Sequence, residues 1–336
     1  MNSLRARTSR YRRRSASRGG SILLLFASLL LVQCGENATE PEPPDLNQDW
    51  MGWEEEIPPV SNNIFYLDPA AGELTNPGTR EEPLPSLGAV VEAGLIRRVV
   101  AVDHPYVEGA ELTIADPDAP IGPGDTIVLL DGDHGFVEIS ESHAEDWVTI
   151  RADAGARPVL RGLELEGVER YRIQGLVIRS PEGDGGPSPL VFLESHGWRG
   201  PCRYIVVEEC DVATVDDSPS WSAADWDERA ASGIGGNGSY LSIRDNRLTN
   251  VNFGVSVSGR YALVERNTIE NFCGDGMRGI GSDMVFEANT VMNCYDVNDN
   301  HDDGFQSWSI NDDPPRERVV LRDNGKVYTK AAVDVK

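Results

Sequence analysis

The sequence predicts an all-β protein built as a parallel β-helix, a solenoid in which each coil stacks on the previous one. Four segments align without gaps at steps of 21, 22 and 35 residues, each carrying the pattern apolar-x-x-Asn. A Gly-apolar pair precedes each segment. Coils of 21 or 22 residues are too short for a strand-helix unit, but they suit short strands separated by Gly and Asn turns.

The repeats define columns of equivalent positions. A side-chain amide both donates and accepts, so stacked Asn residues can satisfy one another and the buried backbone of a turn. A leucine-rich repeat also has an Asn column, but its Leu spacing is not met here. The columns are Ile243, Val264, Phe286 and Leu321 for the core, Asn246, Asn267, Asn289 and Asn324 for the first turn, Asn250, Asn271 and Asn293 for the second, and Ile234, Val255, Met277 and Phe305 for the strand before them.

The two ends of the chain differ in composition from the repeats. Residues 1–33 hold seven arginines, no acid and a short apolar run, which is typical of a signal peptide. Residues 34–62 are acidic and Pro-rich, as a solvated tether would be. We therefore expect a β-helix over 63–325 and an atypical tail over 326–336, which holds all three lysines. Because an uncapped β-helix exposes its core, we expect a truncated gene product.

The charge balance excludes some functions. The chain has 30 Lys+Arg and 55 Asp+Glu, a net charge of −25, so binding to nucleic acid is not expected. The sequence Leu31-Val32-Gln33-Cys34 resembles a bacterial lipobox, which implies lipidation of Cys34. We expect an exported monomer that is secreted or held in the cell envelope (the outer membrane in a Gram-negative cell) by this lipid alone. Four further cysteines allow three disulfide pairings.

The start of the body adds a resemblance. Residues 65–94 contain NPGT (76–79), and GDTI follows at 124–127. These segments resemble the opening of right-handed parallel β-helix proteins that act on carbohydrate, among them pectate lyases, chondroitinase B-like alginate lyases and mannuronan C5-epimerases. The resemblance covers about residues 64–324 and is specific for the fold rather than for the chemistry. It implies a right-handed helix and a polysaccharide substrate.

A charged group is predicted on the last two coils. The columns place Asp275 next to Asp303 and Arg278 next to Gln306 on adjacent coils, with Asp275 and Arg278 near the outer surface or its edge. Adjacent coils lie about 4.8 Å apart, and stacked like charges need a cation. We predict Ca²⁺ as a cofactor, with Asp275, Asp299, Asp302 and Asp303 as ligands. A solvated acidic surface is the alternative.

Three functions follow from this group. The first is β-elimination on an acidic, uronate-containing polysaccharide, in which Ca²⁺ or Arg278 neutralises the substrate carboxylate and His301 or Arg278 removes the C5 proton, with Asp303 in the same catalytic group. The epimerase family's Asp-Pro-His motif is absent. The second is glycoside hydrolysis by paired Asp residues. The third is carbohydrate binding without catalysis. Substrate contacts are predicted for Gln306, Trp221, Trp226 and Trp308.

Overall fold

The described part of the chain is a right-handed parallel β-helix with three parallel sheets. Strands β6 (Phe136–Ala152) and β8 (Gly162–Gln174) are long enough to run through two of these sheets. Those two sheets, sheets 1 and 2 below, are therefore continuous with each other. The predicted signal peptide, Cys34 and most of the predicted tether lie outside the described residues. The computed structural model describes residues 61–181, 189–218, 220–297, 303–309 and 316–327.

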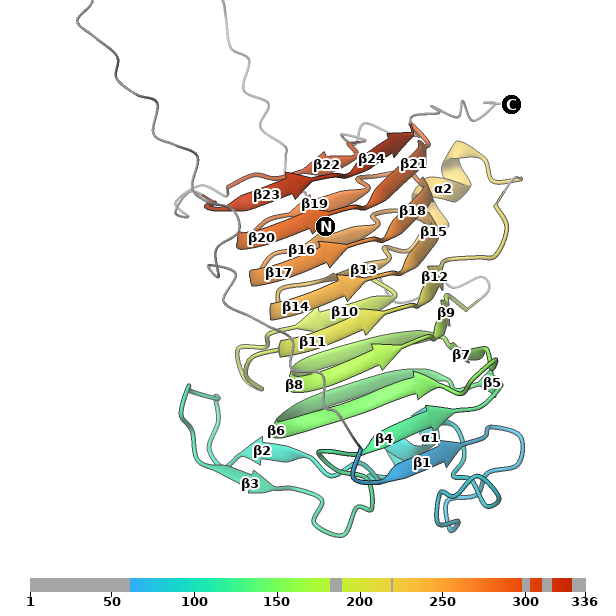
Figure 1. Cartoon of the computed structure of the whole chain (residues 1–336), viewed down its shortest axis with the longest axis vertical. Helices are drawn as coiled ribbons and strands as arrows, with labels where there is room; N and C mark the ends of the chain where they lie inside the picture. Colours follow the sequence, from blue (N-terminus) through green and yellow to red (C-terminus); the bar gives the residue numbers. More distant parts are fainter. Residues whose placement is uncertain (1–60, 182–188, 219, 298–302, 310–315, 328–336) are drawn as a thin grey trace, which may run out of the picture. The chain divides into compact units, whose positions relative to one another are not determined.

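Successive coils add one strand to each sheet, in chain order (Figure 1). Sheet 1 contains the first parts of β6 and β8, then β10 (Val191–Glu194), β13 (Ile234–Gly236), β16 (Val255–Val257), β19 (Met277–Gly279) and β22 (Phe305–Gln306). Sheet 2 contains β1 (Ile64–Leu67), β4 (Thr126–Leu129), the last parts of β6 and β8, β11 (Arg203–Glu208), β14 (Ser239–Arg244), β17 (Arg260–Glu265), β20 (Ser282–Glu287) and β23 (Val319–Arg322). Sheet 3 contains β5 (Gly132–Asp133), β7 (Pro158–Leu160), β9 (Val177–Arg179), β12 (Asp211–Ala213), β15 (Arg247–Val251), β18 (Thr268–Phe272), β21 (Thr290–Cys294) and β24 (Gly325–Val327).

The predicted columns are confirmed by the strand registers. In sheet 2, Ile243 pairs with Val264, then Phe286, then Leu321. In sheet 1, Ile234, Val255, Met277 and Phe305 follow one another in the same way. One hydrophobic core runs through the coils, because inward positions of every sheet are apolar.

The first Asn column forms a continuous ladder between sheets 2 and 3. Asn246 Nδ2 donates to Asn267 Oδ1, Asn267 Nδ2 to Asn289 Oδ1, and Asn289 Nδ2 to Asn324 Oδ1, each at 3.0 Å. The same oxygens accept from the backbone N–H of the Asn below. Each side-chain amide therefore provides hydrogen-bond partners for the next Asn side chain and for the turn backbone. The spacing of the Asn residues predicted this arrangement.

Three elements surround the start of the helix. Helix α1 (Leu87–Glu92) buries Leu87 and Val90 in the common core, with Ser86 as its N-cap. Strands β2 (Val99–Ala101) and β3 (Leu112–Ile114) form a separate antiparallel pair. No helix in the described part of the chain has the length and apolar character that a membrane crossing needs.

Candidate functional site

The outward surface of sheet 1 carries most of the chemistry of the described residues. Positions that alternate with the buried core residues form one outward column across seven strands. Glu138 of β6 pairs with Glu164 of β8, and Glu164 pairs with Phe192 of β10. The column continues through Gly235, Ser256, Arg278 and Gln306. It therefore changes from acidic at its early coils to basic and polar at its late coils.

Four glutamates gather at the acidic end of this surface, and we call them the acidic cluster: Glu138, Glu164, Glu166 and Glu194. Glu166 lies two residues after Glu164 on the same face of β8, and its register partner in β10 is Glu194. Arg199, from the loop after β10, donates from Nη1 to Glu138 Oε1 at 3.3 Å and also contacts Glu166. One guanidinium thus ties together two of the four carboxylates.

Glu164 lies at the centre of the acidic cluster. Partial burial raises the pKa of its carboxyl, and the charges of Glu138, Glu166 and Glu194 raise this pKa further. Among the described residues no cation pairs with Glu164. A carboxyl with a raised pKa beside other carboxylates is an arrangement that suits general acid catalysis.

Space for a ligand adjoins the acidic cluster. A cleft of about 440 Å³ is lined by Glu138, Phe136 and residues of α1, among them Glu92. Trp198, beside Arg199 in the chain, is 56% exposed and stacks on His104 with ring centroids 5.6 Å apart. Exposed aromatic faces beside carboxylates suit contacts with sugar rings, because such rings are apolar on their faces and polar at their edges.

Arg278 is the centre of the basic end of the column. Its central guanidinium carbon lies 3.5 Å from the ring centre of Phe253 and 5.4 Å from that of Trp308. Nε donates to Asp275. Among the described residues none accepts a hydrogen bond from the Arg278 Nη atoms. A guanidinium held this way can bind an anion, but it has no lone pair with which to act as a base.

Asp275 and Asp303 lie on adjacent coils, but they differ in exposure. Asp275 is fully buried, whereas Asp303 is exposed. Asp275 Oδ1 accepts from the Asp303 backbone N–H at 3.0 Å, and Oδ2 accepts from Arg278. The expectation that Asp275 lies near the outer surface is therefore wrong, because its carboxylate is used to close a turn and to hold Arg278.

Each oxygen of Asp275, one of the predicted Ca²⁺ ligands, already has one hydrogen-bond partner within the protein. Asp299, His301 and Asp302 lie outside the described residues. Within the described ranges, no group of three or more His, Cys, Asp or Glu side chains is arranged to hold a metal ion. Gln306 is half-buried on the rung after Arg278, and Trp308 stays partly exposed beside it.

The two other predicted substrate contacts are buried. Trp221 is 8% exposed and Trp226, in helix α2 (Ala223–Arg229), is 1% exposed. Their rings pack edge to face at 5.0 Å, and Trp226 stacks on Tyr295 at 4.6 Å. These two tryptophans anchor the segment between β12 and β13 on the turns that follow β18 and β21. They present no exposed face to a sugar.

Sequence reasoning missed the acidic cluster, although the signal is present. Segments 136–140 (FVEIS), 162–166 (GLELE) and 191–194 (VFLE) alternate apolar and outward residues. Aligning them as successive rungs would have stacked their glutamates.

The sequence alone leaves the cysteine pairings open. Cys202 and Cys210 are buried thiols, and burial raises the pKa of both, to about 12 for Cys210.

No protein-family model matches the chain, and no curated protein matches it either. Solved structures do match. The GH136 lacto-N-biosidase from Eubacterium ramulus is 11% identical with a TM-score of 0.32, over 80% of this chain and 68% of that one. A rhamnogalacturonan lyase is 14% identical with a TM-score of 0.28, over 69% and 75%. At such identities and TM-scores these likenesses carry no argument about the reaction.

Proposed function

We propose that the protein acts on a polysaccharide bound along the outward surface of sheet 1, and that it hydrolyses a glycosidic bond at the acidic cluster. The observation that carries this proposal is the position of Glu164 among three other carboxylates, one on its own strand and one on each adjacent rung. Hydrolysis needs one carboxyl that is protonated and one that is charged. Carboxyls with different neighbours in one cluster have different pKa values, so a single cluster can supply both forms.

Glu164 is the general acid in this proposal, and Glu138 is the nucleophile. Glu164 donates its proton to the oxygen of the leaving sugar while a Glu138 oxygen bonds to the anomeric carbon. Their strands are neighbours at about 4.8 Å, close to the separation of about 5–5.5 Å in retaining enzymes. Water then cleaves the glycosyl-enzyme bond, with Glu164 as base. Arg199 orients Glu138.

A polysaccharide panel tests this proposal through the release of reducing ends. Glu164→Gln and Glu138→Gln should each lower the rate by about 10²-fold or more, because loss of a positioned acid or base costs that much. The matched control is Glu145→Gln, an exposed glutamate on the same long strand. A Glu164→Gln variant that cleaves as fast as the control would refute the assignment.

β-Elimination on a uronate polysaccharide is a second candidate function, and the surroundings of Arg278 favour it. The Nη atoms face no acceptor among the described residues, and the flanking Phe253 and Trp308 rings suit a sugar. Arg278 would pair with the substrate carboxylate, and His301 remains the proposed base. In this case unsaturated products should absorb ultraviolet light, and Arg278→Gln should abolish them while Glu164→Gln should not. Assays with Ca²⁺ or EDTA test the proposed metal separately.

A further inference from the structure

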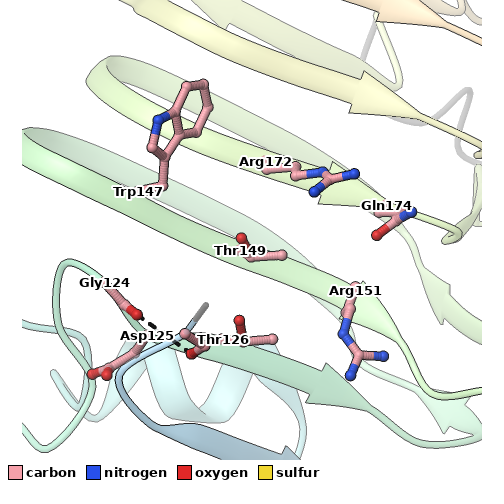
Figure 2. Close-up of a pocket in the computed structure, with 9 residues that line it drawn as sticks. Gly124, Asp125, Thr126, Trp147, Thr149, Arg151, Arg172 and Gln174 are labelled. Atoms are coloured by element: carbon pink, nitrogen blue, oxygen red, sulfur yellow. Dashed lines mark hydrogen bonds between the residues drawn. The ribbon is translucent and has the colours of Figure 1, made fainter. Parts of the chain in front are cut away.

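A polar pocket lies on the outward surface of sheet 2, away from sheet 1 (Figure 2). Its volume is about 200 Å³. Thr126 of β4, Thr149 of β6 and Arg172 of β8 are register partners on three successive strands, and Arg151 and Gln174 form the next outward pair. Trp147, Asp125, Gly124 and Ser61 complete the lining.

Two threonines line this pocket with hydroxyl groups that have no partner among the described residues. Thr126 and Thr149 are each 8% exposed, and they alternate with the core residues Ile127 and Ile150, so their side chains point away from the core. Neither Oγ1 forms a hydrogen bond with a described residue. Hydroxyl groups that open onto a pocket can donate a hydrogen bond to whatever occupies it, so these two groups suit a ligand that accepts hydrogen bonds.

Arg151 adds a positive charge to the pocket. Its Nη1 donates to the Ala152 carbonyl oxygen at 3.0 Å, and among the described residues no carboxylate forms an ion pair with it. The neighbouring Asp153 is taken by Arg80 at 2.7 Å. A guanidinium that keeps unused donors is a good partner for a planar or tetrahedral oxyanion.

The carboxylate oxygens of Asp125 are engaged with groups outside the centre of this pocket. Its Oδ1 accepts from Asn63 Nδ2 at 2.8 Å and from the Asn63 backbone N–H at 3.0 Å, and Oδ2 accepts from Gly122 N–H at 2.8 Å. Figure 2 shows its carboxyl oxygens turned away from Arg151 and Arg172. The lining that faces the pocket is therefore rich in donors.

We propose that this pocket binds a single oxyanion group, a carboxylate or a sulfate, with Arg151 as its cation and the Thr126 and Thr149 hydroxyls as donors. The group comes either from an acidic sugar or from a free inorganic anion. This site is independent of the acidic cluster, since none of its residues belongs to sheet 1. In a protein with a net charge of −25, such a site would place a bound anion beside Arg151, an arginine that has no ion pair among the described residues.

Isothermal titration calorimetry on the purified full chain tests this site at constant ionic strength. Sodium sulfate, sodium acetate and sodium glucuronate are the probes, with glucose as the neutral comparison. Sulfate, glucuronate or both should bind saturably. Arg151→Gln should weaken this binding by about tenfold or more, which is the loss expected for one charge-assisted hydrogen bond. Thr149→Val keeps the β-branched shape of the side chain and should also weaken binding.

The control is Arg247→Gln, an exposed arginine on sheet 3, which should bind like the unaltered chain. Glucuronate binding more tightly than acetate and sulfate would support the proposal with an acidic sugar as ligand. Equal binding of sulfate and glucuronate would support it with a free oxyanion. Absence of saturable binding by all three anions, or equal weakening in Arg247→Gln, would overturn it. Because the readout is binding rather than cleavage, the result does not depend on hydrolysis at sheet 1.

Discussion

Glu164 and Arg278 occupy the same outward column of sheet 1, but their surroundings differ in sign. Glu164 is flanked by carboxylates, and its pKa is raised. Arg278 is paired with the buried Asp275 and lies between two aromatic rings. Four rungs separate the two side chains, which is about 19 Å along the stack. A glycan that spans this distance would meet an acid at one end and a cation at the other.

The pKa of Glu164 gives the first prediction, the pH dependence of hydrolysis. As a general acid, Glu164 must be protonated, so the rate should fall as pH rises through its raised folded-state pKa. Glu194→Gln removes one of the charges that raise this pKa. The falling limb of the pH–rate profile should therefore move to lower pH, while the rate on the acidic side is kept.

The comparison protein for this profile is Glu145→Gln, which removes an exposed charge from β6 without touching the acidic cluster. Its falling limb should coincide with that of the unaltered chain. A limb that moves equally in both variants would mean that general charge, rather than the neighbours of Glu164, sets the profile. A limb that moves in neither would contradict the role of Glu164 as the acid.

At the scale of strands and turns, the sequence predicted what repeats and missed what occurs once. The Asn ladder and the core columns follow from identical side chains at fixed steps. Asp275 was misplaced because it lies in the turn before β19, where the two-residue alternation of a strand does not apply. The same limit affects Trp221 and Trp226, whose loop position said nothing of burial.

The Asn ladder gives the second prediction. Asn267→Ala should lower the free energy of unfolding by about 3 kcal/mol, because several buried donors and acceptors lose their partner at once. Asn267 Nδ2 donates to the Ile243 carbonyl oxygen as well as to Asn289, and its Oδ1 accepts two hydrogen bonds from Asn246. Urea-induced unfolding followed by circular dichroism measures the change.

Asn271→Gly is the matched control from the second Asn column. Asn271 has a φ of 58°, a conformation that glycine adopts freely. Its Nδ2 donates to Asn250 at 3.2 Å and its Oδ1 accepts from Asn293 at 3.3 Å, both longer than the bonds of the first column. Its substitution should cost less than about 1 kcal/mol. Equal losses for the two variants would show that the first column has no special role in holding the coils together.

At the scale of the whole molecule, the excess of acidic residues is organised by arginines at the corners of the coils. Glu169 is one of these acids. It lies 4% exposed at the corner between sheets 1 and 2, where Arg203 Nε donates to it at 2.8 Å and His143 Nδ1 lies 3.0 Å from it. His143 Nε2 in turn lies 2.9 Å from the Arg199 carbonyl oxygen. The network therefore joins the core to the loop that carries Arg199 into the acidic cluster.

Acid should destabilise the protein through Glu169. Burial acts to raise the pKa of this carboxyl, but the hydrogen bonds and charges of His143 and Arg203 outweigh burial, and its pKa is lowered. A lowered folded-state pKa contributes stability above the unfolded-state pKa, and this contribution is lost as pH falls through the folded-state value. Glu169→Gln should therefore cost about 3 kcal/mol near neutral pH, and the difference from the unaltered chain should shrink in acid. Urea-induced unfolding from neutral to acidic pH measures the difference in free energy of unfolding, with the exposed Glu145→Gln as control. A difference that stays constant with pH would contradict the assignment. The rate of hydrolysis should fall together with stability, because the loop that carries Arg199 loses its support.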